Sequence, residues 1–151
     1  MNSKPPVNKP LVGIAVLVRR NGKTLVGVRL SENGYGSYAF PGGGLEFGES
    51  WERCGEREVY EETGMIVQVV PYKDQPYLFV TNNIMDGGKR HYITIWLLAD
   101  WVSGEPENRE PSKCEGWQWL TIKDLKNLIP LDGDHRQWMP VELLEPLDLG
   151  V

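Results

Sequence analysis

Three glutamates lie close together in the sequence, at positions 58, 61 and 62. On a helix with 100° between successive residues, they share an arc of about 100°. Like charges at this spacing repel one another by a few tenths of a kcal/mol per pair, even when exposed. A solvated acidic helix face is the ordinary explanation of such a cluster. The alternative is a cation site with oxygen ligands, which suits Mg²⁺ or Mn²⁺ and not zinc.

Two neighbouring features favour the cation site. Trp51, Gly55 and Val59 recur at helical spacing and mark the buried side of the helix, and this stripe borders the glutamates instead of opposing them. The run Pro41–Gly44 precedes the helix and would bring bare backbone close to the same edge, as oxygen-ligated metals and phosphates require. The glutamates are therefore predicted to lie at the border of the core.

The helix that carries them has clear limits in the sequence. Ser50 is a good N-cap residue, Glu52 is favourable in the first turn, and Gly64 follows Thr63 where a helix commonly ends. We therefore expect a helix over Trp51–Thr63. The glycine-rich segment Ser31–Gly48 before it is expected to be a loop with a brief strand near Tyr38–Phe40.

The rest of the chain predicts an α+β fold. Leu11–Val18 and Thr24–Val28 read as a hairpin closed by the turn residues Asn21 and Gly22. A final short helix should begin after Thr121 with a capping box and end before Pro130. Further strands are expected over Met65–Val70, Tyr77–Asn82, His91–Trp101 and Gly116–Leu120.

Composition limits the class of protein. The chain has 151 residues, a formal charge of −5 and two cysteines, which predicts one domain over residues 11–151 after a disordered segment at 1–10. The acidic balance argues against a partner that is a nucleic acid polymer. No apolar run is long enough for a membrane span, and two distant cysteines make no disulfide framework. A reduced, cytoplasmic protein is expected.

At the glycine run and the helix, the residues match a known pattern. Gly43, Glu49 and the segment Arg57–Met65 give G-x5-E-x7-R-E-U-x-E-E-x-G-U, where U is a bulky aliphatic residue. This resembles the signature of the Nudix hydrolases at every fixed position. The resemblance extends over Leu11–Leu128. Gly44–Ser50 and Cys114–Trp117 look most like the small MutT-type members, which clear nucleoside triphosphates.

The resemblance implies both a fold and a metal site. The fold is a mixed β-sheet packed between helices in an α/β/α sandwich. Divalent cations would be bound by the carboxylates and by one main-chain carbonyl, from Glu58, Glu61, Glu62 and Gly42. Arg57 would orient the carboxylates, and Glu49 would support the metal site or its waters.

The implied reaction is Mg²⁺-dependent hydrolysis of a phosphoanhydride in a nucleotide substrate, with Mn²⁺ as an alternative. Glu61 and Glu115 are the candidates for the base that takes a proton from water. Arg29 is the best-placed phosphate clamp, because a guanidinium can hold phosphate oxygens bidentately. Other candidate contacts with the substrate are the glycine loop at Gly43 and base-binding side chains at Phe79, Asn83 and Trp138.

Three functions follow from these residues. The favoured one is a nucleoside triphosphate diphosphatase, possible substrates including oxidised or otherwise modified dNTPs, that releases NMP and pyrophosphate. The second is the same chemistry on ADP-ribose, a sugar nucleotide or a dinucleoside polyphosphate. Related enzymes that act on ADP-ribose often carry a proline some 16 residues past the motif, where this chain has Val80 and Thr81. The third is a Nudix-fold module that senses a nucleotide without turnover. A homodimer is allowed by the sequence but not required by it.

Overall fold

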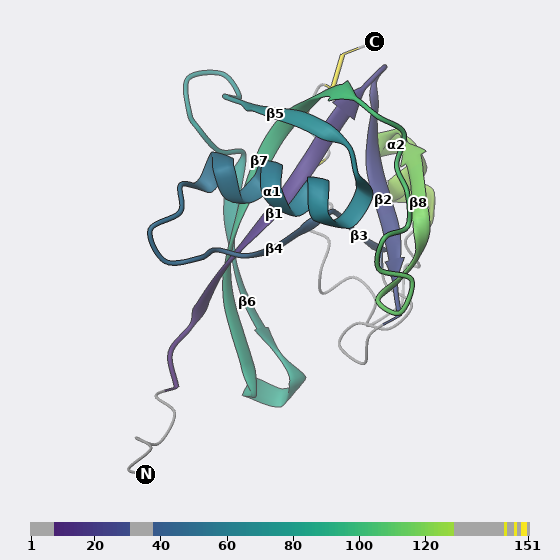
Figure 1. Ribbon diagram of the computed structural model, residues 1–151. Helices are drawn as coiled ribbons and strands as arrows, with labels where there is room; N and C mark the ends of the chain where they lie inside the picture. The colour runs from purple at the N-terminus through teal and green to yellow at the C-terminus, as the bar shows by residue number, and fades with distance from the viewer. Residues whose placement is uncertain (1–7, 31–37, 129–143, 145–146, 148, 151) are drawn as a thin grey trace.

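The fold is centred on two long parallel strands (Figure 1). The computed structural model describes residues 8–30, 38–128, 144, 147, 149 and 150. Strand β1 (Leu11–Arg20) lies beside β7 (Arg90–Ser103) over nine paired positions, from Leu11 opposite Tyr92 to Arg19 opposite Asp100. This pair supports every other element of the sheet.

The remaining strands add to both sides of this pair. The main order is β3-β2-β1-β7-β5, while β4 pairs with β1, β6 with β7 and β8 with β2. Among the strands of the described residues only the β1–β7 pairing is parallel, so the sheet is mixed. The other strands are β2 (Lys23–Arg29), β3 (Tyr38–Ala39), β4 (Gly42–Gly44), β5 (Ile66–Val70), β6 (Phe79–Met85) and β8 (Cys114–Leu120).

The predicted N-terminal hairpin is confirmed. Asn21 and Gly22 connect β1 to β2 with φ angles of 52° and 75°. Two successive residues with positive φ are the requirement of a type I′ turn, whose twist matches that of the flanking strands. The turn therefore sets the register in which Arg20 lies opposite Lys23.

One prediction about the glycine run is wrong. Gly42–Gly44 form strand β4, antiparallel to β1, where an irregular loop was expected. The pairing is close: a Cβ atom at Gly42 would lie 2.0 Å from the carbonyl oxygen of Ile14. Glycine permits strand pairing at a separation that no side chain would allow, and propensity rules do not detect this.

The hairpin of β6 and β7 also differs from the prediction. Strand β6 begins at Phe79 and continues to Met85, and the turn contains the short 3-10 helix η1 (Asp86–Gly88). The hairpin extends beyond the body of the domain (Figure 1). Its length carries Asn83 and Arg90 toward the region of β4.

Helix α1 (Trp51–Thr63) covers one face of the sheet with the predicted limits. The Oγ atom of Ser50 accepts a hydrogen bond from the amide of Arg53 at 3.2 Å, and Gly64 ends the helix with φ of 80°. Below α1, one core cluster joins the helix to β1, β5 and β7, with Cys54, Val59, Ile14, Val16, Val18, Val67, Leu97 and Ala99 among its members.

The opposite face of the sheet carries a second core. Helix α2 (Ile122–Leu128) begins with the predicted capping box, in which the amide of Asp124 donates to Thr121 Oγ1 at 3.0 Å and the amide of Thr121 donates to Asp124 Oδ2 at 3.2 Å. Leu125 of α2 packs with Leu17, Trp96 and Leu98 on this face. The sheet thus lies between helices, as the sandwich prediction requires. Within the described residues, neither helix is long and apolar enough to cross a bilayer.

Thr63 closes the end of α1 and generates a prediction on stability. Its side chain is fully buried; its hydroxyl donates to the carbonyl of Val59 at 2.6 Å and accepts the amide of Met65 at 3.1 Å. Thr63→Val keeps the shape but leaves the buried amide without its partner, so we expect a loss of about 1–3 kcal/mol in the free energy of unfolding. Urea denaturation measures it. Thr63→Ser, which keeps the hydroxyl, should lose less, and equal losses would contradict the assignment.

Candidate active site

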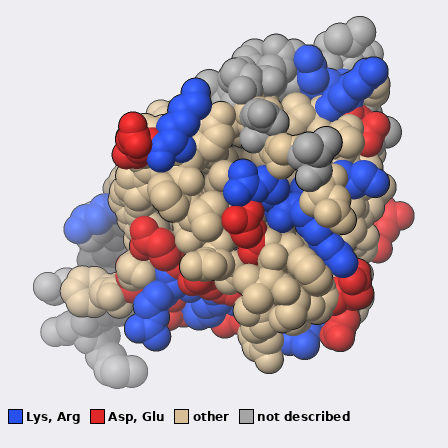
Figure 2. Space-filling model, turned by 90° about the horizontal axis from the view of Figure 1, so that it is seen from above, with Lys and Arg blue, Asp and Glu red and all other residues tan. Residues whose placement is uncertain are grey.

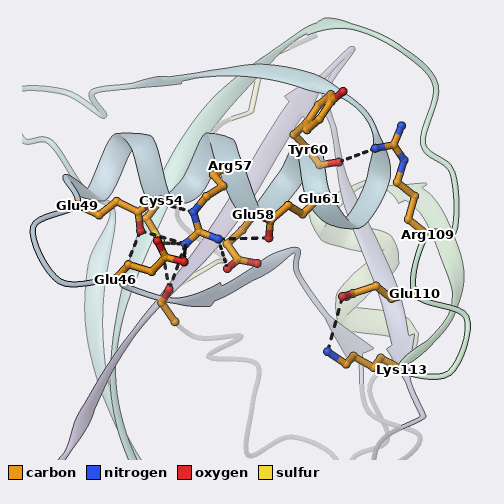
Figure 3. Close-up of polar contacts among 11 residues, drawn as sticks. Glu46, Glu49, Cys54, Arg57, Glu58, Tyr60, Glu61, Arg109, Glu110 and Lys113 are labelled. Atoms are coloured by element: carbon orange, nitrogen blue, oxygen red, sulfur yellow. Dashed lines mark hydrogen bonds and ion pairs between the residues drawn. The ribbon is translucent and has the colours of Figure 1, made fainter.

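Arg57 of α1 joins the carboxylates of the signature (Figure 3). Its Nε donates to Glu49 Oε2 at 2.7 Å and its Nη2 to Glu49 Oε1 at 3.0 Å, in a bidentate pair. Its Nη1 donates to Glu58 at 2.9 Å and to Glu61 at 3.2 Å. The hydrogen bonds from Arg57 lower the pKa of Glu49 to about 2. One guanidinium therefore holds the carboxylates of Glu49, Glu58 and Glu61.

The glycine strand β4 lies directly against Glu58. A Cβ atom at Gly43 would come within 2.4–2.6 Å of the Glu58 carboxyl group. Glycine at this position therefore leaves the space that the carboxylate fills. The Glu58 side chain is only 15% exposed, and burial raises its pKa in spite of the nearby Arg57. Its hydrogen bond with Arg57 therefore offsets only part of the cost of burying the negative charge of Glu58.

Glu62 is the most strongly perturbed carboxyl group of the site. Burial is the main cause that raises its pKa to about 8, and the charges of Glu58 and Glu110 add to it. A hydrogen bond with the backbone of Gly42 acts in the opposite direction. A buried cluster of this kind favours binding a cation, because the cation would remove the repulsion that burial intensifies.

Glu110 is a residue that the sequence reasoning missed. It lies in the loop of residues 104–113, between β7 and β8, and lines a cavity of about 550 Å³ together with Glu58 and Glu62. Glu115, the acid predicted from outside the helix, lies exposed on β8 and is not among the residues that line this cavity. No local pattern marks Glu110, because its position depends on the path of the loop across the end of α1.

Two arginines line the same cavity as the acids. Arg29 ends β2 and Arg90 begins β7, and both reach this cavity. Burial lowers the pKa of Arg29, the charge of Glu62 raises it, and the charge of Arg90 lowers it. The space between the acidic helix and these guanidinium groups therefore offers cationic donors on one side and carboxylates on the other. Over the face in Figure 2, acidic and basic side chains are interspersed and do not form one continuous basic patch.

A second cavity, of about 240 Å³, adjoins the first. The two share the β4 glycines, Arg29, Arg90 and Tyr92. Its β1 side is open because Gly13 and Ala15 are small, and they lie opposite Thr94 and Trp96 of β7. This cavity therefore lies on the side of the sheet that carries the second core, next to the acidic cavity.

Of the three predicted base-binding residues, one lines the smaller cavity, one does not, and one lies outside the described residues. Asn83 lines the smaller cavity, and its Oδ1 accepts a hydrogen bond from the Thr81 hydroxyl at 2.8 Å. Phe79 packs against the Trp96 ring at 5.3 Å between centroids and is not among the cavity-lining residues. Trp138 lies outside the described residues.

The donor set fits a hard divalent cation in kind. Glu58, Glu62 and Glu110 supply carboxylate oxygens, the ligands that Mg²⁺ and Mn²⁺ prefer, and the β4 backbone lies beside them. Over the described ranges, no three acidic, histidine or cysteine side chains converge as a ready-made metal cluster. Glu58 and Glu61 are instead held by Arg57. Glu58 already lines the cavity, whereas Glu61 would have to turn from the guanidinium toward it.

The comparisons with known proteins agree on the family. The sequence profile of the NUDIX domain matches residues 9–141. The ADP-ribose pyrophosphatase of Methanocaldococcus jannaschii is 30% identical over 128 residues, which cover 85% of this chain and 70% of that protein. The RNA pyrophosphohydrolase of Novosphingobium aromaticivorans is 26% identical over 133 residues, which cover 80% of this chain and 82% of that protein.

The fold agrees as well. The crystal structure of a MutT NUDIX hydrolase from Burkholderia pseudomallei superposes with a TM-score of 0.72 and 27% identity, covering 91% of this chain and 99% of that one. The chain therefore belongs to the NUDIX family, as a pyrophosphohydrolase that acts on substrates in which a nucleoside diphosphate is linked to a further group.

Proposed function

We propose that this protein hydrolyses a nucleoside triphosphate to the nucleoside monophosphate and pyrophosphate, with Mg²⁺ as the cation and Mn²⁺ as an alternative. The observation that carries the proposal is the pairing of two adjoining cavities. One has carboxylates facing arginines, and the other has the size of a single base and sugar. The first suits a polyphosphate with its cations, and the second suits the nucleoside that bears it.

Different side chains would hold the phosphates, the base and the cation. Arg29 and Arg90, where the cavities meet, are placed to hold phosphate oxygens, as planar guanidinium groups do bidentately. Asn83 and Trp96 would contact the base. When bound at Glu58, Glu62 and Glu110, the cation would supply neutralisation of the charge that develops between the two phosphates.

A carboxylate must also take the proton from the attacking water. Glu61 is 54% exposed and held by Arg57, whereas Glu110 lines the cavity itself. Because Glu110 is assigned to the cation and Glu115 does not line the cavity, Glu61 is left as the candidate proton acceptor, and its side chain would have to turn from Arg57 toward the cavity.

A second candidate is hydrolysis of ADP-ribose. The similarity to the enzyme of Methanocaldococcus jannaschii favours it. Against it stands the absence of the proline that related ADP-ribose enzymes often carry near positions 80–81. A dinucleoside polyphosphate needs room for two nucleosides, and the smaller cavity suits one. A non-catalytic sensor is disfavoured because all glutamates of the signature are present.

A substrate panel tests the proposal. Purified protein with Mg²⁺ or Mn²⁺ would be offered normal, oxidised and methylated dNTPs, ADP-ribose and a dinucleoside polyphosphate, and the products separated by ion-exchange chromatography. We expect NMP and pyrophosphate in equal amounts from at least one triphosphate. AMP from ADP-ribose with intact triphosphates would establish the second candidate, and inactivity on every substrate would favour the sensor.

The carboxylates of the signature should be needed for turnover and not for folding. Glu61→Gln and Glu62→Gln each remove a negative charge next to the proposed cations, so we expect kcat to fall by about 10²-fold or more. Steady-state kinetics on the best substrate measures this, and thermal unfolding shows that the fold persists. Glu52→Gln, on the exposed first turn of the same helix, is the matched control and should keep full activity. Unchanged turnover in both site variants would contradict the metal assignment.

The raised pKa of Glu62 predicts a proton released on cation binding. Near pH 7 the carboxyl group, with a pKa of about 8, still holds a proton that a cation must displace. The apparent affinity for Mg²⁺ should therefore increase with pH up to about 8. Calorimetric titration in buffers of different ionisation enthalpy counts the protons, and Glu62→Gln should abolish this release.

The same shift has a consequence for stability without the cation. The unfolded chain loses this proton near the ordinary value of 4.5, while the folded chain keeps it to about 8. The folded state binds more protons between these values, so the free energy of unfolding should decrease as the pH rises through this range. In chelator, Glu62→Gln should flatten this decrease. An unchanged pH profile would contradict the burial of Glu62.

Filling the smaller cavity should separate nucleoside binding from cation binding. Ala15→Leu places a larger side chain on the cavity wall formed by β1. We expect KM for the nucleotide to rise about tenfold or more while Mn²⁺ binding, measured by electron paramagnetic resonance, is unchanged. An unaltered KM would show that the nucleoside binds elsewhere.

A further inference from the structure

The loop of residues 104–113 is fastened to the end of α1 by hydrogen bonds to the helix's last carbonyl groups. The amide of Glu107 donates to the carbonyl of Thr63 at 2.9 Å, and the amide of Arg109 donates to the carbonyl of Glu62 at 3.3 Å. The loop thereby supplies donors that a helix C-terminus otherwise lacks. Its path is set by the helix that carries the signature glutamates.

The side chain of Arg109 completes this contact (Figure 3). Its Nη1 donates to the carbonyl of Tyr60 at 3.4 Å, and its guanidinium carbon lies 5.2 Å from the centroid of the Tyr60 ring. It also lies over Gly64, where a Cβ atom would come within 2.6 Å of Nη2. A positive charge here is favourable because the C-terminal end of a helix carries partial negative charge. Arg109 therefore contacts the end of α1 at three places: the carbonyl of Tyr60, the Tyr60 ring and Gly64.

Glu110 follows Arg109 directly and is held on its other side as well. The carbonyl of Glu110 accepts the amides of Lys113 at 2.9 Å and Cys114 at 3.1 Å, which leads the chain into β8. The residue is thus fixed between the end of α1 and the start of β8. Its side chain lines the cavity with Glu58 and Glu62.

We propose that Arg109 is a positioning residue, which docks the loop of residues 104–113 on the end of α1 and so holds Glu110 toward Glu58 and Glu62. This inference rests on the part of the proposed function that assigns Glu110 to the cation site. Arg109 itself is not among the residues that line either of the two cavities. It acts on the site only through the residue next to it.

The first part of the loop is held by a separate set of contacts, which supplies a control. Arg20 forms a bidentate pair with Glu105, at 3.0 and 3.1 Å, and Trp101 Nε1 donates to the carbonyl of Gly104 at 2.7 Å. These contacts fasten the same loop without touching Glu110. Loss of Arg20 and loss of Arg109 should therefore both loosen the loop, while only loss of Arg109 should alter the cation site.

A double-mutant cycle tests the proposal. Mn²⁺ binding, measured by electron paramagnetic resonance without any nucleotide, would be compared in Arg109→Ala, Glu110→Gln and the double variant. We expect each single substitution to weaken binding by about tenfold, in the range typical of groups that support metal ligands. The double variant should bind no more weakly than Glu110→Gln alone, because Arg109 acts through Glu110.

Arg20→Ala is the matched control: alone it should bind Mn²⁺ as the unmodified protein does, and combined with Glu110→Gln it should bind as Glu110→Gln alone does. If Arg109→Ala fails to fold, Arg109→Met serves in its place, since it keeps an apolar stem over Tyr60 and loses the donors. Three results would overturn the proposal. Mn²⁺ affinity could be unchanged in the folded Arg109 variant, or unchanged in Glu110→Gln. The double variant could also bind Mn²⁺ more weakly than Glu110→Gln alone, by the product of the two single losses. Because no nucleotide is used, failure of the substrate panel would not imitate any of them.

Discussion

The site depends on negative charge that is kept partly out of water. Glu58 and Glu62 are partly buried at the edge of the core, burial raises the pKa of both, and the charge of Glu58 raises the pKa of Glu62 further. Arg57 compensates part of this charge through Glu49, Glu58 and Glu61, but Glu62 lies beyond its hydrogen bonds. Arg29 offsets part of the charge of Glu62, but burial still raises the pKa of Glu62, so a divalent cation in this cavity would be stabilising.

The elements with local signals could be predicted from the sequence. Helix α1 is bounded by a side-chain cap at Ser50 and by glycine at position 64, and the first hairpin is closed by two residues that tolerate positive φ. Each of these signals operates within a few residues. The clustering of three glutamates on one helix surface is local in the same sense, so this acidic part of the candidate site could be predicted from the sequence.

The missed features depend on contacts between distant segments. Strand β4 exists because Gly42 can approach the backbone of β1 some 28 positions earlier, which strand propensity does not report. Glu110 reaches the cavity because its loop follows the end of α1, and Arg90 because the β6–β7 hairpin is long. Glu115 has a more suggestive sequence context than Glu110, but its strand leaves it exposed.

Strand β4 separates the two cavities and is shared by both. The carboxylates of Glu58 and Glu62 lie on the helix side of this strand, whereas the smaller cavity is shaped mainly by β1 and the β6–β7 hairpin. A substitution at Asn83, which lines only the smaller cavity, would change the proposed nucleoside side without altering the lining of the acidic cavity. A division of this kind would allow one way of breaking the bond to serve different substrates, and relatives of this chain are named for ADP-ribose in one case and for RNA in another.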